Sequence, residues 1–189
     1  MMGREHGDFT PFWQERDYVT QAAGVRAAVF IVHGQADWNV RQRHAIEWYH
    51  ALEGRVPLRM WLHGGGHSYP SRSSFQAAKW AWFDRYVHGV DNGVEDQAAV
   101  EVQEANGRWR AQDAWPHEAT MTADWYLGES TRLSDMVGAG GSVSFEDQGR
   151  SRSISEQIRN PTRVRSDRVT FLSEPLDAAR LLSGTPRMH

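Results

Sequence analysis

The chain has 189 residues, of which 40% are hydrophobic and 24% charged, and its formal net charge is -3. A charge balance this mild gives no reason to expect nucleic acid or an anionic membrane surface as a partner. The sequence contains no cysteine, which excludes disulfides, thiol catalysis and cysteine-ligated zinc.

The chain opens with MMGREHGDFTPFWQERDY, which lacks the apolar segment of a secretory signal peptide. Residues 27–32, AAVFIV, then have the length and continuous apolar character of a strand buried on both faces. Residues 41–53 carry apolar side chains at helical spacing, 58–62 form a second apolar run, and 75–86 return to helical spacing. No run approaches the roughly 20 apolar residues that span a bilayer.

The order strand–helix–strand–helix is typical of a parallel α/β sheet with right-handed crossovers. Two strands are too few for a complete doubly wound domain. We therefore predict that residues 1–93 are the C-terminal part of a larger α/β sheet.

The pattern changes after residue 93. Short, partly alternating segments separated by turns replace the helical periodicity; they are residues 98–103, 123–127, 141–146 and 168–172. This pattern predicts an all-β domain over residues 94–189, an incomplete β-sandwich of the jelly-roll type. Within it, residues 148–168 are rich in arginine, which fits an anion-binding loop or, the interpretation we favour, a long solvated connection.

Tryptophan is unusually frequent, with nine residues. Because an indole needs a large apolar contact surface, we expect Trp109, Trp115 and Trp125 to pack into the sandwich core or its interface with the α/β part. Exposure of at least two of them in one patch would favour a carbohydrate- or protein-binding module instead.

Each of the two predicted strands is followed by a turn that carries one residue suited to acid–base catalysis. Asp37 follows the first strand, in VHGQADWNV, and His67 follows the second, in LHGGGHS. Neighbouring parallel strands lie about 4.8 Å apart and end at the same edge of a sheet, so we expect the two side chains to form a hydrogen bond. A carboxylate that orients an imidazole, with the second imidazole nitrogen free to take a proton, makes up two members of a Ser-His-Asp triad.

The nucleophile of such a triad is missing from the sequence. In α/β-hydrolases the serine precedes the aspartate and the histidine, within a G-x-S-x-G turn. No G-x-S-x-G occurs here, and Ser142 in GGSVS lacks the required spacing. We therefore expect the chain to be a C-terminal fragment that is inactive by itself.

Other interpretations of the same residues stay open. His33 and His63 fall at the strand ends, where oxyanion or packing roles are expected. Asp37, His63 and His67 have side chains that bind metals, but their spacing is generic, and we predict neither a metal nor another cofactor.

These motifs resemble a known family. VHGQADWNV, followed about thirty residues later by HGGGHS, is similar to the second half of the catalytic domain of Xaa-Pro dipeptidyl-peptidases. VTFLSEPLDAARLLSGTP resembles the family's sandwich segment, with Leu172 where threonine is usual. The resemblance implies an α/β-hydrolase domain followed by a jelly roll, with Asp37 and His67 as triad members and Asn39 lining the pocket that accepts proline.

The activity that the resemblance implies is a serine peptidase that releases Xaa-Pro dipeptides from peptide N-termini without a cofactor. Its partner is then a peptide with proline at the second position. The alternatives are an esterase or acylase of the same architecture, and a non-catalytic binding sandwich.

Overall fold

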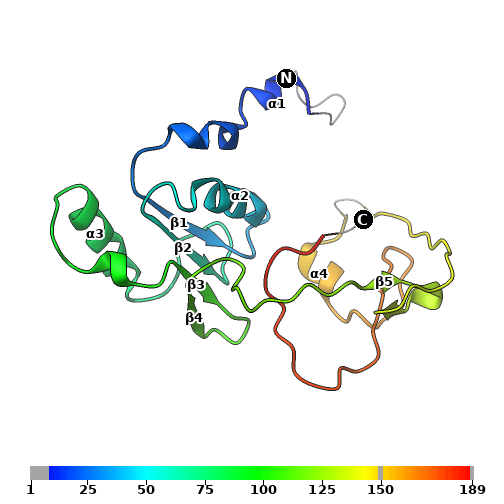
Figure 1. The fold of residues 1–189 in the computed structure, drawn as a ribbon. Coiled ribbons are helices and arrows are strands. Elements are labelled where there is room, and N and C mark those ends of the chain that lie inside the picture. Colours follow the sequence, from blue (N-terminus) through cyan, green and yellow to red (C-terminus); the bar gives the residue numbers. More distant parts are fainter. Residues whose placement is uncertain (1–8, 149–150, 188–189) are drawn as a thin grey trace. The chain divides into compact units, whose positions relative to one another are not determined.

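A computed structural model of the protein describes residues 9–148 and 151–187. Residues 1–8, which belong to the stretch without signal-peptide character, lie outside the described residues. The described residues form two compact units, one of residues 9–118 with 184–187, and a second from Ala119 to Ser183 (Figure 1).

The first unit contains all the elements that position the candidate site. In chain order these are α1 (Pro11–Gln14), η1 (Tyr18–Gly24), β1 (Val29–Gly34), α2 (Gln42–Leu52), β2 (Leu58–His63), α3 (Phe75–Tyr86), η2 (Val94–Asp96), β3 (Val100–Gln103) and β4 (Trp109–Gln112). The predicted order of strand, helix, strand and helix is confirmed, with ends that shift by one or two residues.

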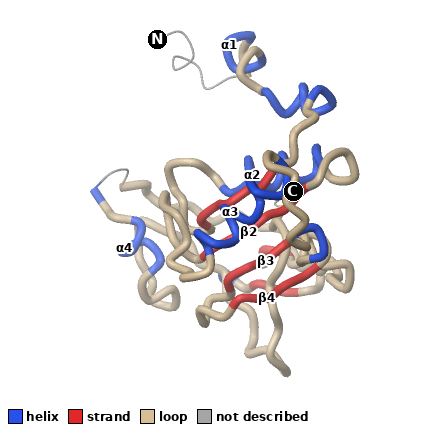
Figure 2. The backbone as a smooth tube through the Cα atoms, turned by 90° about the vertical axis from the view of Figure 1, so that its left-hand side faces the viewer, coloured by secondary structure: helices blue, strands red, loops and turns tan. Residues whose placement is uncertain are grey.

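A four-stranded sheet with the order β1-β2-β3-β4 organises this unit, and Figure 2 shows its strands in red. β1, β2 and β3 are parallel, whereas β4 returns antiparallel to β3. Val29 pairs with Leu58 and Gly34 pairs with His63, so β1 and β2 begin and end in register. Both strands therefore deliver their following loops to the same edge of the sheet.

Helix α2 covers one face of the sheet and α3 covers the other. Successive side chains of a strand point to opposite faces, so each strand contributes to both contacts. On β2, Met60 and Leu62 are fully buried in a cluster with Ile46 and Tyr49 of α2. Trp61 points to the other face and packs against the first turn of α3. Each such large buried side chain contributes roughly 1.5–3 kcal/mol, so β2 is the most firmly held strand.

β3 and β4 join this sheet, although residues 98–103 were expected to begin the sandwich. Local alternation identifies a strand but not its partner, and β3 pairs with β2 through Met60, Trp61 and Leu62. The compact unit continues to Glu118, beyond the predicted domain boundary after residue 93. That boundary stays a prediction.

The second unit contains little regular structure: β5 (Tyr126–Leu127), η3 (Glu129–Thr131), β6 (Leu133–Ser134) and α4 (Ile154–Ile158). β5 and β6 form a two-stranded antiparallel sheet. Residues 168–172 make only single bridges, and no strand forms over residues 141–146. The jelly roll therefore stays a prediction.

The arginine-rich segment of this unit contains a helix that the sequence analysis did not predict. α4 begins with a capping box in which Ser153 and Glu156 bond to each other's backbone N–H groups. Nearby, the carboxylate of Asp167 accepts hydrogen bonds from Arg165, at 2.7 Å, and pairs with Arg152, at 2.8 Å. The hydrogen bond from Arg165 lowers the pKa of Asp167 to about 2.

The tryptophans divide between the two units. Trp115 is buried in the apolar cluster between α2 and β2, and Trp109 contacts Trp61 with a ring-centroid distance of 5.4 Å. Trp125 is exposed, at 37%. These three indoles do not form the exposed patch that would have favoured a binding module. No helix in the described part of the chain has the length and apolar character needed to cross a bilayer.

Candidate active site

Asp37 and His67 meet at the edge of the sheet where β1 and β2 end. Asp37 lies three residues beyond β1 and His67 four residues beyond β2. The Nδ1 atom of His67 is 2.8 Å from Oδ2 of Asp37. The predicted hydrogen bond between the two side chains is therefore confirmed.

The carboxylate of Asp37 is held on both oxygens. Its Oδ1 accepts hydrogen bonds from the backbone N–H groups of Asn39 and Val40, both at 2.9 Å. The Val40 N–H is the strongest cause that lowers the pKa of Asp37 to about 2, and it acts with His67 and Asn39 against the opposing effect of burial. Asp37 is therefore ionised at neutral pH.

His67 presents one ring nitrogen to this carboxylate, and within the described part of the chain the other nitrogen has no hydrogen-bond partner. An ionised carboxylate only accepts hydrogen bonds, so the proton between the two groups belongs to Nδ1 of His67, and in the neutral imidazole Nε2 is then the nitrogen with the lone pair. The His67 side chain is 65% exposed, whereas that of Asp37 is 4% exposed. A buried, oriented carboxylate behind an accessible imidazole is the arrangement of a general base.

The two loops interlock, which fixes the pair. The Gln35 N–H donates to the His63 carbonyl at 2.7 Å, and the Ala36 N–H donates to the Gly65 carbonyl at 3.0 Å. Gly34 lies where the loops cross: a methyl group on its Cα would sit 2.2 Å from the Gly66 carbonyl oxygen. Only glycine permits this approach.

His33 and His63 form hydrogen bonds with the backbone of the two loops and are not part of the Asp37–His67 pair. Nε2 of His33 donates to the Val40 carbonyl at 3.0 Å, which steadies the residue whose N–H binds Asp37. His63 is buried, its Nδ1 accepts the Gly65 N–H at 3.2 Å, and burial lowers its pKa. Among the described residues, no group of three or more acidic or histidine side chains is placed to hold a metal.

Asn39 contributes its backbone to the site. Its N–H binds Asp37, and its side chain is exposed. The lining of a proline pocket by Asn39 stays a prediction. Within the described residues, His67 forms no hydrogen bond to a serine hydroxyl.

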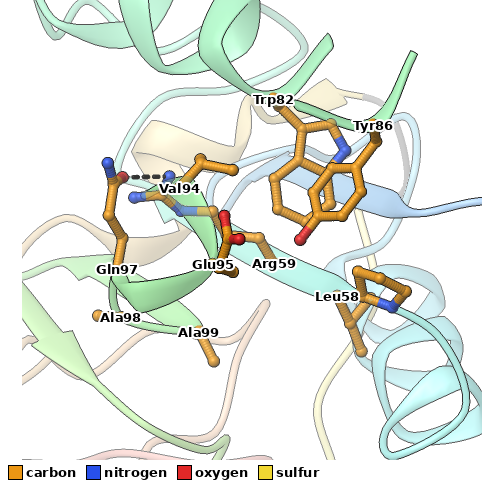
Figure 3. Close-up of a pocket in the computed structure, with 10 residues that line it drawn as sticks. Leu58, Arg59, Trp82, Tyr86, Val94, Glu95, Gln97, Ala98 and Ala99 are labelled. Carbon is orange, nitrogen blue, oxygen red and sulfur yellow. Dashed lines mark hydrogen bonds between the residues drawn. The ribbon is translucent and has the colours of Figure 1, made fainter. Parts of the chain in front are cut away.

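A cavity of about 280 Å³ lies at the opposite ends of the strands, and Figure 3 shows Trp82 and Tyr86 of α3 above Leu58 of β2 within it. Neither Asp37 nor His67 lines this cavity. The site is therefore defined by its hydrogen bonds and not by this cavity.

The sequence analysis missed three supports of the site. Gly34 had a local signal, a glycine at the strand end. The bond from His33 to Val40 and the role of Gln103, described below, had none, because the partners lie 7 and 39 residues away in the chain.

Two family models match the chain. The model described as X-Pro dipeptidyl-peptidase (S15 family) matches residues 2–69, which include both Asp37 and His67. The model described as the X-Pro dipeptidyl-peptidase C-terminal non-catalytic domain matches residues 92–189.

Individual relatives agree with these matches. A Bacillus cereus protein assigned to the Xaa-Pro dipeptidyl-peptidases is 35% identical over 98% of this chain and 33% of its own length. The Xaa-Pro dipeptidyl-peptidase of Streptococcus gordonii is 39% identical over 35% of this chain and 9% of its own length. The chain thus spans about a third of the Bacillus relative.

Solved structures also resemble this chain. Their sequence identities are low, so they are evidence for the fold and not for the function. An α-amino acid ester hydrolase matches with a TM-score of 0.57 and 21% identity, over 76% of this chain and 28% of that one. A CocE/NonD family hydrolase from Staphylococcus aureus matches with a TM-score of 0.57 and 16% identity, over 70% and 24%. These likenesses support the α/β-hydrolase part of the fold prediction.

Proposed function

Because this chain belongs to the X-Pro dipeptidyl-peptidase family, we propose that Asp37 and His67 are two members of the Ser-His-Asp triad of a serine peptidase. The observation that carries the proposal is the hydrogen bond of 2.8 Å between them, on interlocked loops, with Nε2 of His67 accessible. The serine belongs to a preceding part of the full-length polypeptide, since this sequence has no G-x-S-x-G.

In this function His67 accepts and then donates a proton in each of the two half-reactions. Its Nε2 takes the proton of the serine hydroxyl while that oxygen attacks the carbonyl carbon of the substrate's proline. The ionised Asp37 stabilises the imidazolium that forms. His67 then gives the proton to the departing amine as the C–N bond breaks, and an acyl-enzyme remains. A water molecule, deprotonated in the same way, attacks the acyl-enzyme; the C–O bond to the serine breaks, His67 returns the proton to the serine oxygen, and an Xaa-Pro dipeptide is released.

The second candidate is an esterase or acylase activity from the same pair. It is motivated by the fold likeness to an α-amino acid ester hydrolase. The Asp37–His67 pair can act in amide hydrolysis and in ester hydrolysis alike. Only the substrates that the protein hydrolyses therefore distinguish a peptidase from an esterase or acylase. A non-catalytic module is the third possibility, and an accessible base on a buried carboxylate argues against it.

The test is an assay of the full-length gene product that contains this sequence. It is supplied with an Xaa-Pro chromogenic amide, the matching Xaa-Ala amide and a simple phenyl ester. We expect hydrolysis of the Xaa-Pro amide, loss of this activity in His67→Ala, and full activity in His88→Ala, an exposed histidine after α3. Ester hydrolysis without Xaa-Pro cleavage would support the esterase, and no His67-dependent hydrolysis of any substrate would contradict both.

A further inference from the structure

Gln103, the last residue of β3, contacts the roots of both loops without belonging to the Asp37–His67 pair. Its side-chain Oε1 accepts the Gly64 N–H at 2.9 Å, directly after β2. Its backbone carbonyl accepts from Nε2 of Gln35 at 2.7 Å, directly after β1. One residue of the third strand therefore binds the first residue of each loop.

The side chain of Gln103 is itself fixed by the turn between β3 and β4. Its Nε2 donates to the Gly107 carbonyl at 3.1 Å. That turn is closed by hydrogen bonds between Glu104 and Arg108 and between Gly107 and Glu104, both at 2.8 Å, and Gly107 has a φ of 85°. With Nε2 engaged on Gly107, Oε1 is directed toward Gly64.

We propose that Gln103 is a positioning residue, which holds the His67 loop through Gly64 and the Asp37 loop through Gln35 so that the hydrogen bond between Asp37 and His67 stays closed. The catalytic consequence of this positioning rests on the proposed function, but the positioning does not. The two loops already bind each other through Gln35 and Ala36. Gln103 adds a connection of both loops to the sheet, because it is itself part of β3.

The test measures the hydrogen bond itself. In the ¹⁵N-labelled 189-residue chain at pH 8, the Nδ1–H proton of His67 is assigned by its loss in His67→Gln, and its exchange with water is timed. Gln103→Met keeps the length of the side chain and removes its hydrogen bonds. Gln103→Glu keeps an acceptor for the Gly64 N–H. Gln76→Met, on the exposed face of α3, is the matched control.

We expect exchange to accelerate about three- to tenfold in Gln103→Met, as for the loss of one ordinary hydrogen bond. Gln103→Glu should restore most of the protection, and Gln76→Met should match the wild type. Equal exchange in Gln103→Met and the wild type would overturn the proposal, as would a failure of Gln103→Glu to protect better than Gln103→Met. Should Gln103→Met not fold, Gln35→Met is measured in its place, with the same expected acceleration.

A second readout separates this proposal from the proposed function. Turnover of the full-length product on the Xaa-Pro amide is measured for the same variants. Faster exchange with lower kcat and unchanged KM supports both proposals. Faster exchange with unchanged turnover supports the positioning role and contradicts the catalytic role of the pair.

Discussion

Among the described residues, each compact unit contains one buried aspartate, and the two differ in the chemistry of their partners. Asp37 and Asp167 have side chains that are each 4% exposed, and the pKa of each is lowered to about 2. Asp167 is held by Arg165 and Arg152, which stay protonated at any physiological pH. Asp37 is held by backbone N–H groups and by an imidazole, which can take up and release a proton.

This contrast teaches that a lowered carboxylate pKa does not by itself mark a catalytic site. Between arginines, a carboxylate can only organise the chain around it. Behind an accessible imidazole, the same carboxylate stabilises the charge that forms when the imidazole takes a proton.

The two units also differ in what surrounds these aspartates. The buried apolar side chains among the described residues all lie in the first unit, between Ala22 and Trp115. In the second unit, Asp167 is the one buried residue in the described part. The first unit thus rests on apolar packing, and the second on a polar network around arginines.

The largest expected difference concerns activity. Asp37→Asn should lower kcat of the full-length product on an Xaa-Pro amide by about 10⁴-fold, because the amide favours the wrong imidazole tautomer. Asp167→Asn should leave kcat within about threefold where circular dichroism shows a folded protein, because no proton transfer involves it. Equal losses in the two folded variants would remove the distinction between the aspartates.

The contrast in packing predicts a difference in stability. Leu62→Ala, at a fully buried position of β2, should destabilise the first unit by about 2–5 kcal/mol. Leu172→Ala, at a side chain that is 44% exposed in the second unit, should change stability by no more than about 0.5 kcal/mol. Urea unfolding followed by tryptophan fluorescence and circular dichroism measures both. Similar losses would show that the second unit has an apolar core after all.

Glycine substitutions test whether the loops depend on close contact. Gly34→Ala should cost about 1–3 kcal/mol and break the Asp37–His67 hydrogen bond, because the added methyl group would overlap the Gly66 carbonyl. Gly140→Ala, with open space around its Cα, is the matched control in the second unit. Thermal unfolding and the His67 Nδ1–H resonance report the two effects, and an unchanged resonance in Gly34→Ala would show that the loops need not interlock.

Acid should affect both aspartates over one pH window, with different results. A carboxylate whose folded pKa is lowered stabilises the fold above its ordinary pKa of 3.8 and loses this effect as the pH falls through about 2. Protonation of Asp167 should disperse the arginine network, while protonation of Asp37 should release His67 from an otherwise intact sheet. Two-dimensional NMR between pH 5 and pH 2 distinguishes the outcomes. If the amide resonances of β2 disappeared together with those near Asp167, the sheet would not stay intact and the predicted difference between the two units would be wrong.

The sequence predicted the parts of this molecule that depend on local periodicity. The apolar runs fixed β1 and β2, the helical spacing fixed α2 and α3, and parallel pairing placed Asp37 beside His67. α4 was missed although Ser153 and Glu156 carry a capping-box pattern, because arginines dominate the surrounding composition. The assignment of β3 to the sheet and the contacts of Gln103 depend on tertiary pairing, which no local pattern records.

The most direct test of the central claim is the labelling rate of the full-length product by a fluorophosphonate, which reacts with serines that a neighbouring base activates. If Asp37 and His67 activate a serine, the wild type and His88→Ala should label equally fast, and His67→Ala should label slower by a factor on the order of 10⁴ or more. Equal labelling of His67→Ala and the wild type, or labelling that maps to a serine within these 189 residues, would contradict the assignment.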